Sequence, residues 1–164
     1  MPKKYILDGE TVRIKLERMA FEVVENNIDE SQIVLVGIEE NGSIIARNIQ
    51  TLLRSICKID IELISLKIDK KIPKEVTLSE NKDFNGKVVL IIDDVANSGK
   101  TMLYALKPFL GFQAKKIQTL ALVERTHKTF PIHLDYVGLS VATTLLEHIY
   151  VEVEGEKIAG AYLQ

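Results

Sequence analysis

Apolar residues at the start of the chain follow first a helical spacing and then the continuous run of a buried strand. Residues between Glu10 and Asn27 place apolar side chains three or four positions apart with charges between them, and Asp8 precedes them as a candidate cap. The inward positions are Val12, Leu16, Met19, Ala20 and Val23. This pattern predicts an amphipathic helix. The apolar run at 33–38 predicts a strand covered on both faces.

The same alternation continues to the end of the chain. A second helix is predicted after the sequence EENG, with Ile44, Ile45, Ile49, Leu52 and Leu53 on one face. Strands are predicted at 58–68, 87–93, 117–123 and 135–142, and a third helix at about 100–110 with Leu103, Leu106 and Leu110 inward. The last fifteen residues read as a strand, a Glu-Gly-Glu turn and an extended piece. Apolar strands that alternate with amphipathic helices predict an α/β fold, with a parallel sheet and helices on both faces.

One stretch does not fit this alternation. Residues 67–85, KIDKKIPKEVTLSENKDFN, are polar, lysine-rich and poor in helical periodicity. A segment of this length inside a compact domain is either a functional loop or a hairpin that the pattern does not reveal.

Composition adds limits on the class of protein. The length of 164 residues suits a single domain, and the net charge of −2 provides no general attraction for DNA, RNA or an anionic membrane. The single cysteine, Cys57, lies among aliphatic residues and is expected to be a buried, inert thiol. The N-terminus lacks the apolar run of a secretory signal, and no apolar segment is long enough to span a bilayer. We therefore expect a cytoplasmic protein without membrane contact.

Two adjacent carboxylates, Asp93 and Asp94, end the most apolar strand of the chain. In open α/β sheets, ligands bind beyond the carboxyl ends of the strands. Because neighbouring carboxylates repel each other, something must compensate for them, either hydroxyl groups of a ligand or a metal ion. Taken alone, the pair could equally be a solvated strand end or a helix cap.

The residues that follow the two aspartates favour a binding site. Ala96, Asn97, Ser98, Gly99, Lys100 and Thr101 are mostly small and polar, and they lead into the predicted third helix. Backbone N–H groups at such a point, with the hydroxyls of Ser98 and Thr101, suit a phosphate monoester. The ending Ser-Gly-Lys-Thr also resembles a P-loop, but Asp94 occupies the place of its first glycine and would repel phosphate. A sugar phosphate, with its hydroxyls on the aspartates, fits both halves of the motif.

The sequence VLIIDDVANSGKT, residues 89–101, resembles the 13-residue signature of the type I phosphoribosyltransferases, with all its defining positions filled. Segments at 5–27, 33–49 and 121–143 extend the likeness over nearly the whole chain. Within that family they are most similar to the pyrimidine operon attenuation proteins, which are also uracil phosphoribosyltransferases. The resemblance implies a five-stranded parallel sheet with flanking helices, and a small hood formed by the N-terminal segment and about 124–164. It also implies 5-phosphoribosyl 1-pyrophosphate with Mg²⁺ as substrate, and a homodimer or larger assembly.

The resemblance also implies roles for individual residues. Asp93 and Asp94 would bind the ribose hydroxyls and hold the metal, directly or through water, and residues from Val95 to Thr101 would bind the 5′-phosphate. The loop made of Gly37, Ile38, Glu39, Glu40, Asn41 and Gly42 would hold the pyrophosphate. Val123, Arg125 and Tyr136 would approach the base from the segment at the hood.

Three features depart from the family pattern. Glu39 and Glu40 are acidic where a basic residue is common, and they would either point away, hold metal or remain solvated at the helix start. The segment after Lys67 lacks the usual aromatic–basic pair, although Lys67, Lys70, Lys71 and Lys74 could neutralise pyrophosphate or simply face solvent. Phe21 stands where RNA-binding relatives carry a histidine, so RNA binding is doubtful. The three histidines form no metal-binding pattern.

The sequence therefore favours two functions. The first is an enzyme that transfers phosphoribosyl to a nucleobase, with uracil as the first candidate. The second is a regulator of pyrimidine genes that senses phosphoribosyl pyrophosphate or a nucleotide with little turnover, with RNA as a conceivable target. Both require the signature around Asp93 and Asp94.

Overall fold

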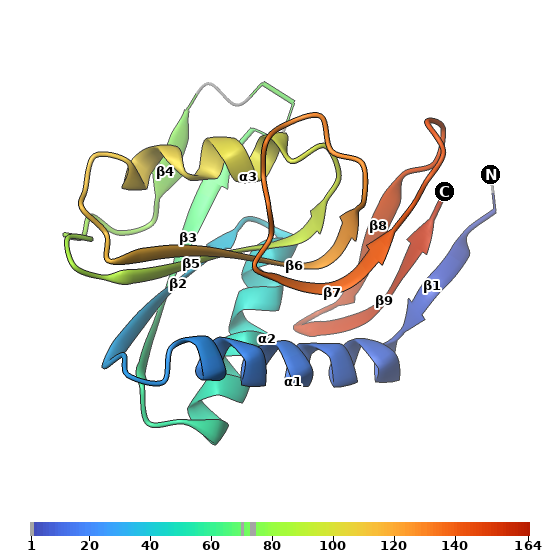
Figure 1. The fold of residues 1–164 in the computed structure, drawn as a ribbon. Coiled ribbons are helices and arrows are strands. Elements are labelled where there is room, and N and C mark those ends of the chain that lie inside the picture. The colour runs from blue at the N-terminus through green and yellow to red at the C-terminus, as the bar shows by residue number, and fades with distance from the viewer. Residues whose placement is uncertain (1, 70, 73–74) are drawn as a thin grey trace.

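The strands of the protein form two sheets in a computed structural model that describes residues 2–69, 71–72 and 75–164 (Figure 1). The larger sheet has the strand order β4-β3-β2-β5-β6-β7. Its strands are β2 (Gln32–Ile38), β3 (Asp60–Ile68), β4 (Val76–Leu78), β5 (Val88–Ala96), β6 (Lys116–Arg125) and β7 (Tyr136–Val141). From β3 to β7 all neighbours are parallel, as expected, and β4 adds an antiparallel strand at the edge.

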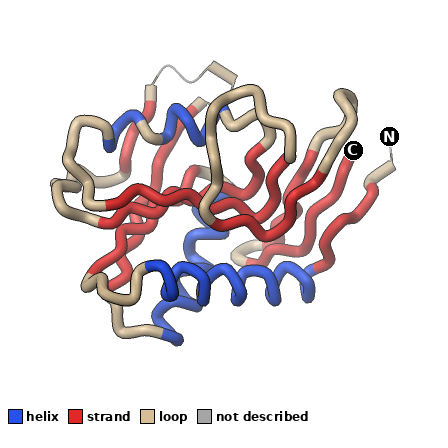
Figure 2. The backbone as a smooth tube through the Cα atoms, viewed as in Figure 1, coloured by secondary structure: helices blue, strands red, loops and turns tan. Residues whose placement is uncertain are grey.

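Helices cover both faces of the larger sheet (Figures 1 and 2). One face carries α1 (Gly9–Asn26) and α2 (Asn41–Ile56), and the other carries α3 (Lys100–Ala105). Buried residues form two apolar clusters, one that includes the inward side chains of α1 and α2 and one that includes those of α3. Strands covered on both faces must be apolar throughout, which explains the continuous runs in β2 and β5.

The first helix agrees with its prediction. The five inward residues of α1 are buried, and the Asp8 carboxylate caps the helix by accepting a 2.7 Å hydrogen bond from the Thr11 N–H. The third helix, by contrast, was predicted too long. It ends at Ala105 and continues as a 3₁₀ turn (Lys107–Phe109), because the Pro108 ring is incompatible with the interior of an α-helix. Leu110 is therefore exposed rather than inward.

The polar stretch at 67–85 contains a strand that the pattern did not predict. Residues of β4 pair antiparallel with the end of β3, so part of the stretch forms a hairpin. Lys70 and Lys74, which were considered for pyrophosphate binding, lie outside the described residues.

The smaller sheet has the order β1-β9-β8 and stands beside the larger one in Figure 1. It consists of β1 (Lys4–Asp8), β8 (Ile149–Glu154) and β9 (Lys157–Leu163), with Gly155 at a positive φ of 62° in the turn before β9. We call these three strands the hood. The hood expected from about residue 124 onward is smaller here, because β7 and the end of β6 pair within the larger sheet.

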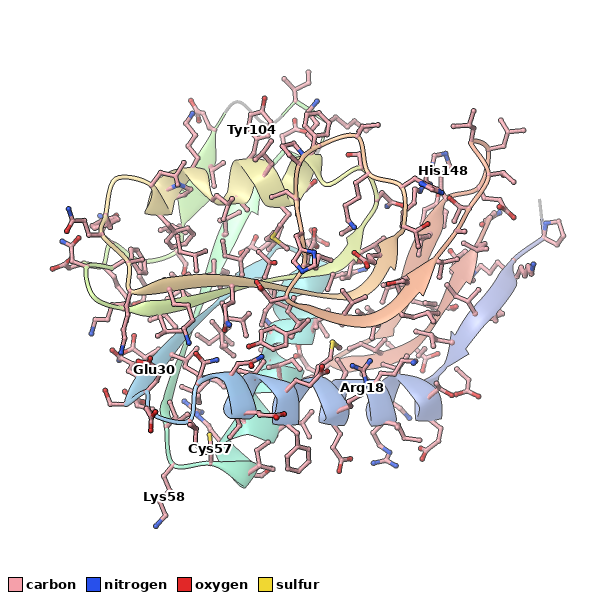
Figure 3. The ribbon with its side chains drawn as sticks, in the orientation of Figure 1. Arg18, Glu30, Cys57, Lys58, Tyr104 and His148 are labelled. Atoms are coloured by element: carbon pink, nitrogen blue, oxygen red, sulfur yellow. The ribbon has the colours of Figure 1, made fainter. Side chains whose placement is uncertain are left out.

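Two further features of the chain are simple to place. Cys57 follows α2 at the end distant from the hood (Figure 3), is half-buried, and directs its Sγ at the Leu53 carbonyl. Within the described ranges, no helix combines the length and the apolar character needed to cross a membrane.

Candidate active site at the carboxyl ends of the strands

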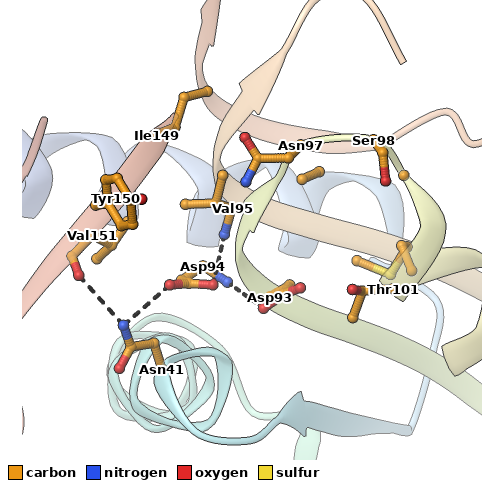
Figure 4. A pocket seen from close by; sticks show the side chains of 13 residues that line it. Asn41, Asp93, Asp94, Val95, Asn97, Ser98, Thr101, Ile149, Tyr150 and Val151 are labelled. Carbon is orange, nitrogen blue, oxygen red and sulfur yellow. Dashed lines mark hydrogen bonds between the residues drawn. The ribbon is translucent and has the colours of Figure 1, made fainter. Parts of the chain in front are cut away.

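A cavity of about 350 Å³ lies where the carboxyl end of β5 meets the edge strand β8 of the hood (Figure 4). Its lining comes from three places: the end of β5 with the following loop and the first turn of α3, the first residue of α2, and β8. The lining residues are Asn41, Asp93, Asp94, Val95, Ala96, Asn97, Ser98, Gly99, Thr101, Met102, Ile149, Tyr150 and Val151. The cavity thus brings together most of the residues that the signature motif pointed to.

Asp93 and Asp94 lie at the cavity floor and are 1% and 8% exposed. Each carboxylate accepts a hydrogen bond from the backbone N–H of the next residue, at 2.9 Å for Asp93 and 2.8 Å for Asp94. The Asn41 amide also donates to Asp94 Oδ2 at 3.2 Å. These bonds to the charged form offset part of the cost of burying two like charges, and they orient the carboxylates toward the cavity.

The loop between β5 and α3 forms the wall expected to hold phosphate. Gly99 has a φ of +85°, a conformation that other residues rarely adopt, and the Ser98 hydroxyl accepts a hydrogen bond from the Lys100 N–H at 3.2 Å. The segment after β6 holds this loop in place, because the N–H groups of Thr129 and Phe130 both donate hydrogen bonds to the Ser98 carbonyl. Lys100 itself is not a lining residue; its ammonium lies 6.0 Å from the centre of the Phe130 ring.

A small ionic network supports this loop on its outer side. Lys128 Nζ lies 2.5 Å from a Glu124 carboxylate oxygen, and the Ser140 hydroxyl donates to the other oxygen at 2.7 Å. Burial pushes the pKa of Glu124 upward, but the hydrogen bonds from Lys128 and Ser140 outweigh it and hold the pKa below its usual value. The Lys128 stem packs toward Gly99, so the network reaches the loop between β5 and α3.

The loop assigned to pyrophosphate is divided between two places. Asn41 lines the main cavity, whereas Glu39 and Glu40, joined by a cis peptide bond, line a separate open depression with Lys67, Asp69 and Glu75. Lys67 Nζ is 3.9 Å from the Glu39 carboxylate. The depression is therefore mainly acidic.

Glycines make the close packing of this loop possible. A Cβ on Gly37 would lie 2.7 Å from the Ser43 Cα, and a Cβ on Gly42 would lie 2.7 Å from the Ile92 carbonyl oxygen. The start of α2 can approach the end of β5 for this reason, which brings Asn41 to Asp94.

The three residues expected at the base have different positions. Val123 is fully buried in the core, and Tyr136, at the start of β7, donates a hydrogen bond to Gln118 and does not line the cavity. Burial raises the pKa of the Tyr136 hydroxyl despite this bond. Tyr136 is level with Ile92, two strands across the sheet, and its hydroxyl accepts a hydrogen bond from Asn26 of α1, so it faces away from the cavity. Arg125, at the end of β6, does lie at that edge and donates to the Glu147 carbonyl at 2.7 Å.

Sequence reasoning missed the contribution of β8. Ile149, Tyr150 and Val151 form one wall of the cavity, and the Val151 carbonyl accepts a hydrogen bond from Asn41 at 3.4 Å. Their local pattern indicates a strand but contains no sign of the site, because β8 reaches the cavity through tertiary packing against β5.

The carboxylates are compatible with a magnesium ion bound through substrate. Among the described residues, no group of three or more His, Cys, Asp and Glu side chains could hold a metal by itself. Mg²⁺ commonly uses one or two protein carboxylates together with water and substrate phosphates. Asp93 and Asp94 are oxygen donors of that type, so they fit such an ion.

Comparisons with known proteins identify the family of this chain. Residues 3–154 match the phosphoribosyl transferase domain family. The chain is 34% identical to a bifunctional protein PyrR of Enterococcus faecalis over 94% of this chain and 92% of that protein, and 33% identical to the one of Streptococcus uberis over 93% and 91%.

Solved structures show the same fold at low sequence identity. The hypoxanthine phosphoribosyltransferase of Trypanosoma cruzi superposes with a TM-score of 0.75 at 14% identity, covering 85% of this chain and 82% of that one. A hypoxanthine-guanine phosphoribosyltransferase of Bacillus anthracis gives 0.71 at 18%, covering 86% and 84%. With the signature residues gathered in one cavity and the family model matching most of the sequence, this chain belongs to the phosphoribosyl transferase family and is a type I phosphoribosyltransferase similar to the PyrR proteins.

Proposed function

We propose that this protein transfers the phosphoribosyl group of 5-phosphoribosyl 1-pyrophosphate to a nucleobase and releases pyrophosphate. Uracil is the first base to test, because the sequence most resembles the pyrimidine operon attenuation proteins. The proposal depends above all on one observation: Asp93 and Asp94 share a cavity with the loop of Ser98, Gly99 and Thr101.

The residues of the cavity suggest how they would act. The two carboxylates accept hydrogen bonds from the ribose 2′- and 3′-hydroxyls, and the loop donates backbone N–H and hydroxyl hydrogens to the 5′-phosphate. The ribose, held at both ends, presents C1′ toward β8. Positive charge develops on C1′ as pyrophosphate leaves. The nearby carboxylates stabilise that charge electrostatically. A bound Mg²⁺ would neutralise the leaving pyrophosphate.

A direct assay tests the proposal. The protein is mixed with phosphoribosyl pyrophosphate, Mg²⁺ and each common base in turn, and pyrophosphate release is followed. We expect release that depends on a base. A protein that binds neither phosphoribosyl pyrophosphate nor ribose 5-phosphate would contradict the assignment of the site.

A second function is favoured by the charges next to the site. The depression lined by Glu39, Glu40, Asp69 and Glu75 is acidic, where a pyrophosphate group would need cations. A regulator that senses a nucleotide or phosphoribosyl pyrophosphate, with little turnover, would tolerate this arrangement better than an enzyme. Tight binding without pyrophosphate release from any base would support this alternative.

We further propose a cytoplasmic homodimer or larger assembly, following the family resemblance. Light scattering after gel filtration measures the assembly size. RNA binding is the less favoured function. The net charge is −2, and the exposed residue on α1 where RNA-binding relatives carry a histidine is Phe21. A signal for RNA that falls steeply with added salt would restore it.

A further inference from the structure

The outward face of α1 and of the turn after it carries a line of apolar side chains. Ile14, Phe21 and Ile28 are 53%, 53% and 74% exposed, and they follow one another at intervals of seven residues. Seven residues make almost two full turns of an α-helix, so the three side chains share one face, opposite the buried face of α1. Single exposed apolar residues are common, whereas an aligned set indicates a contact surface. We call these three residues the α1 stripe.

A hollow of about 390 Å³ adjoins the C-terminal end of the stripe. Val24 and Ile28 line it from α1 and the turn after it, and Cys57, Lys58 and Ile59 line it from the segment that follows α2. Cys57 and Lys58 are labelled at this end of α2 in Figure 3. Because most of these side chains are apolar, the hollow suits an aliphatic side chain from another molecule.

The stripe is symmetric about its middle residue. Ile14 precedes Phe21 by seven residues, and Ile28 follows it by seven. A twofold axis through Phe21 therefore places Ile14 of one copy against the Ile28 end of an antiparallel second copy. A twofold interface is isologous, so its surface must complement itself in this way. Helices that cross at a shallow angle of about 20° stay in contact over such a length.

Charges beside the stripe complement each other under the same symmetry. Glu10 lies one turn before Ile14, and Lys58 lines the hollow that Ile14 of the second copy would enter. Arg13 would lie opposite Asp29 of the second copy, because each is eight residues from Phe21. Both are pairs of opposite charge, which favour the antiparallel arrangement.

The charge of α1 also disfavours other occupants. The helix carries four glutamates against three basic residues, so it offers no attraction for nucleic acid or an anionic membrane. Glu17 would lie opposite Glu25 of the second copy. Arg13, which lies 2.7 Å from Glu10 and 3.3 Å from Glu17, weakens that repulsion. A second copy of the chain is therefore the occupant that fits this face best.

We propose that α1 binds α1 of a second copy of this chain in antiparallel orientation. The two Phe21 rings meet at the twofold axis, and Ile14 of each copy enters the hollow of the other. This contact assigns a surface to the homodimer proposed above and does not depend on the reaction proposed for the cavity. Because the contact is about one helix wide, it belongs to the small class of specific interfaces, and we expect a dissociation constant in the micromolar range.

The first experiment measures self-association by sedimentation equilibrium over a range of protein concentrations. Phe21→Glu places two like charges at the axis, so the dissociation constant of the dimer should rise at least about tenfold. Leu110→Glu is the matched control, because Leu110 is 72% exposed after α3 and lies outside the stripe. It should leave the dissociation constant unchanged. Both positions are exposed, so both variants should remain folded, which circular dichroism checks.

The second experiment traps the contact as a disulfide in a Cys57→Ser background, which removes the natural thiol. Phe21→Cys should form a covalent dimer with itself under mild oxidation, and Leu110→Cys should not. Ile14→Cys mixed with Ile28→Cys should form a mixed disulfide faster than either variant forms one with itself. That preference is specific to antiparallel helices with Phe21 at the axis.

Several outcomes would overturn the proposal. A protein that stays monomeric at all concentrations has no such contact. A dimer that Phe21→Glu leaves intact, with no cross-link at position 21, would keep the homodimer but place its interface elsewhere. Faster cross-linking of Ile14→Cys with itself would indicate parallel helices. RNA binding that Phe21→Glu abolishes, without any change in self-association, would assign this face to nucleic acid instead.

Discussion

Burying the carboxylates of Asp93 and Asp94 side by side costs free energy, and hydrogen bonds from neighbouring groups offset part of that cost. Two carboxylates at the end of a buried strand would normally repel each other, yet each accepts a backbone N–H within its own turn of chain. Asn41 adds a donor from α2 to Asp94. Under the proposed function, the same carboxylates would accept hydrogen bonds from the ribose hydroxyls.

Replacing Asp94 with asparagine tests its role. Asp94→Asn replaces a charged acceptor by a neutral amide, so affinity for ribose 5-phosphate should fall at least about tenfold, the loss expected when a hydrogen bond to a charged group is weakened. Calorimetric titration measures the affinity. Asp29→Asn, at an exposed position after α1, is the control and should bind normally. Unchanged affinity in Asp94→Asn would remove Asp94 from the site.

Glu124 should make the stability of the protein depend on pH. Its pKa is lowered in the folded state, so the stability it contributes is present above its unfolded pKa, near 4.5, and is lost as the pH falls through the folded value. Glu124→Gln should therefore lower the free energy of unfolding at pH 7 and have much less effect at pH 3. Urea unfolding at both pH values measures this. The exposed Glu25→Gln is the control, and an equal loss at both pH values would contradict the argument.

At the scale of the elements, helix starts are the points where the local sequence matters most. The cap of α1 is purely local: the Asp8 carboxylate accepts a hydrogen bond from the Thr11 N–H, and this bond, with a smaller contribution from the Thr11 side chain, holds the pKa of Asp8 below its usual value. Asp8→Ala should lower the free energy of unfolding, measured by urea unfolding at pH 7. Asp8→Asn should retain most of it. A neutral effect of Asp8→Ala would mean that packing alone sets the start of α1.

The start of α2 depends instead on tertiary packing. Gly42→Ala would place a Cβ 2.7 Å from the Ile92 carbonyl, so α2 would have to move away from β5. We expect a loss of about 1–3 kcal/mol of stability and weaker binding of ribose 5-phosphate, because Asn41 moves with the helix. Gly111→Ala is the control, since its Cβ would meet nothing within 4 Å. Normal stability and binding in Gly42→Ala would show that the packing is looser than it looks.

At the scale of the whole molecule, charge separates the two candidate functions. The chain carries a net charge of −2, and the depression beside the cavity adds local negative charge from Glu39, Glu40 and their neighbours. The negative charge on this side of the cavity therefore weakens the binding of an anionic substrate unless cations bind with it.

Reversing one of these charges should strengthen substrate binding. Glu39→Lys is expected to raise affinity for phosphoribosyl pyrophosphate severalfold at low salt, with a smaller gain at 0.5 M salt because of screening. Titrations at the two salt concentrations measure it, with ribose 5-phosphate as a ligand that should respond less. Glu25→Lys, exposed on the far part of α1, controls for general charge. An equal gain for both variants would show that Glu39 is not near the pyrophosphate.

Much of the fold could be predicted from the chain because its elements are strongly periodic. The helices α1 and α2 and the parallel strands have patterns that match the surfaces they bury. The exceptions have local causes: Pro108 shortens α3, and β1 and β4 are short edge strands with too few residues for a clear alternation.

The sequence by itself determined the motif at 89–101, since its aspartates, glycine and hydroxyls are contiguous and act through local backbone geometry. Tertiary structure alone decided which distant residues complete the site. It placed Asn41 of α2 next to Asp94 of β5, packed β8 against the cavity and left Tyr136 buried in the core. The reason is physical: contacts between residues far apart in the chain depend on strand order and packing, which no local pattern of residues records.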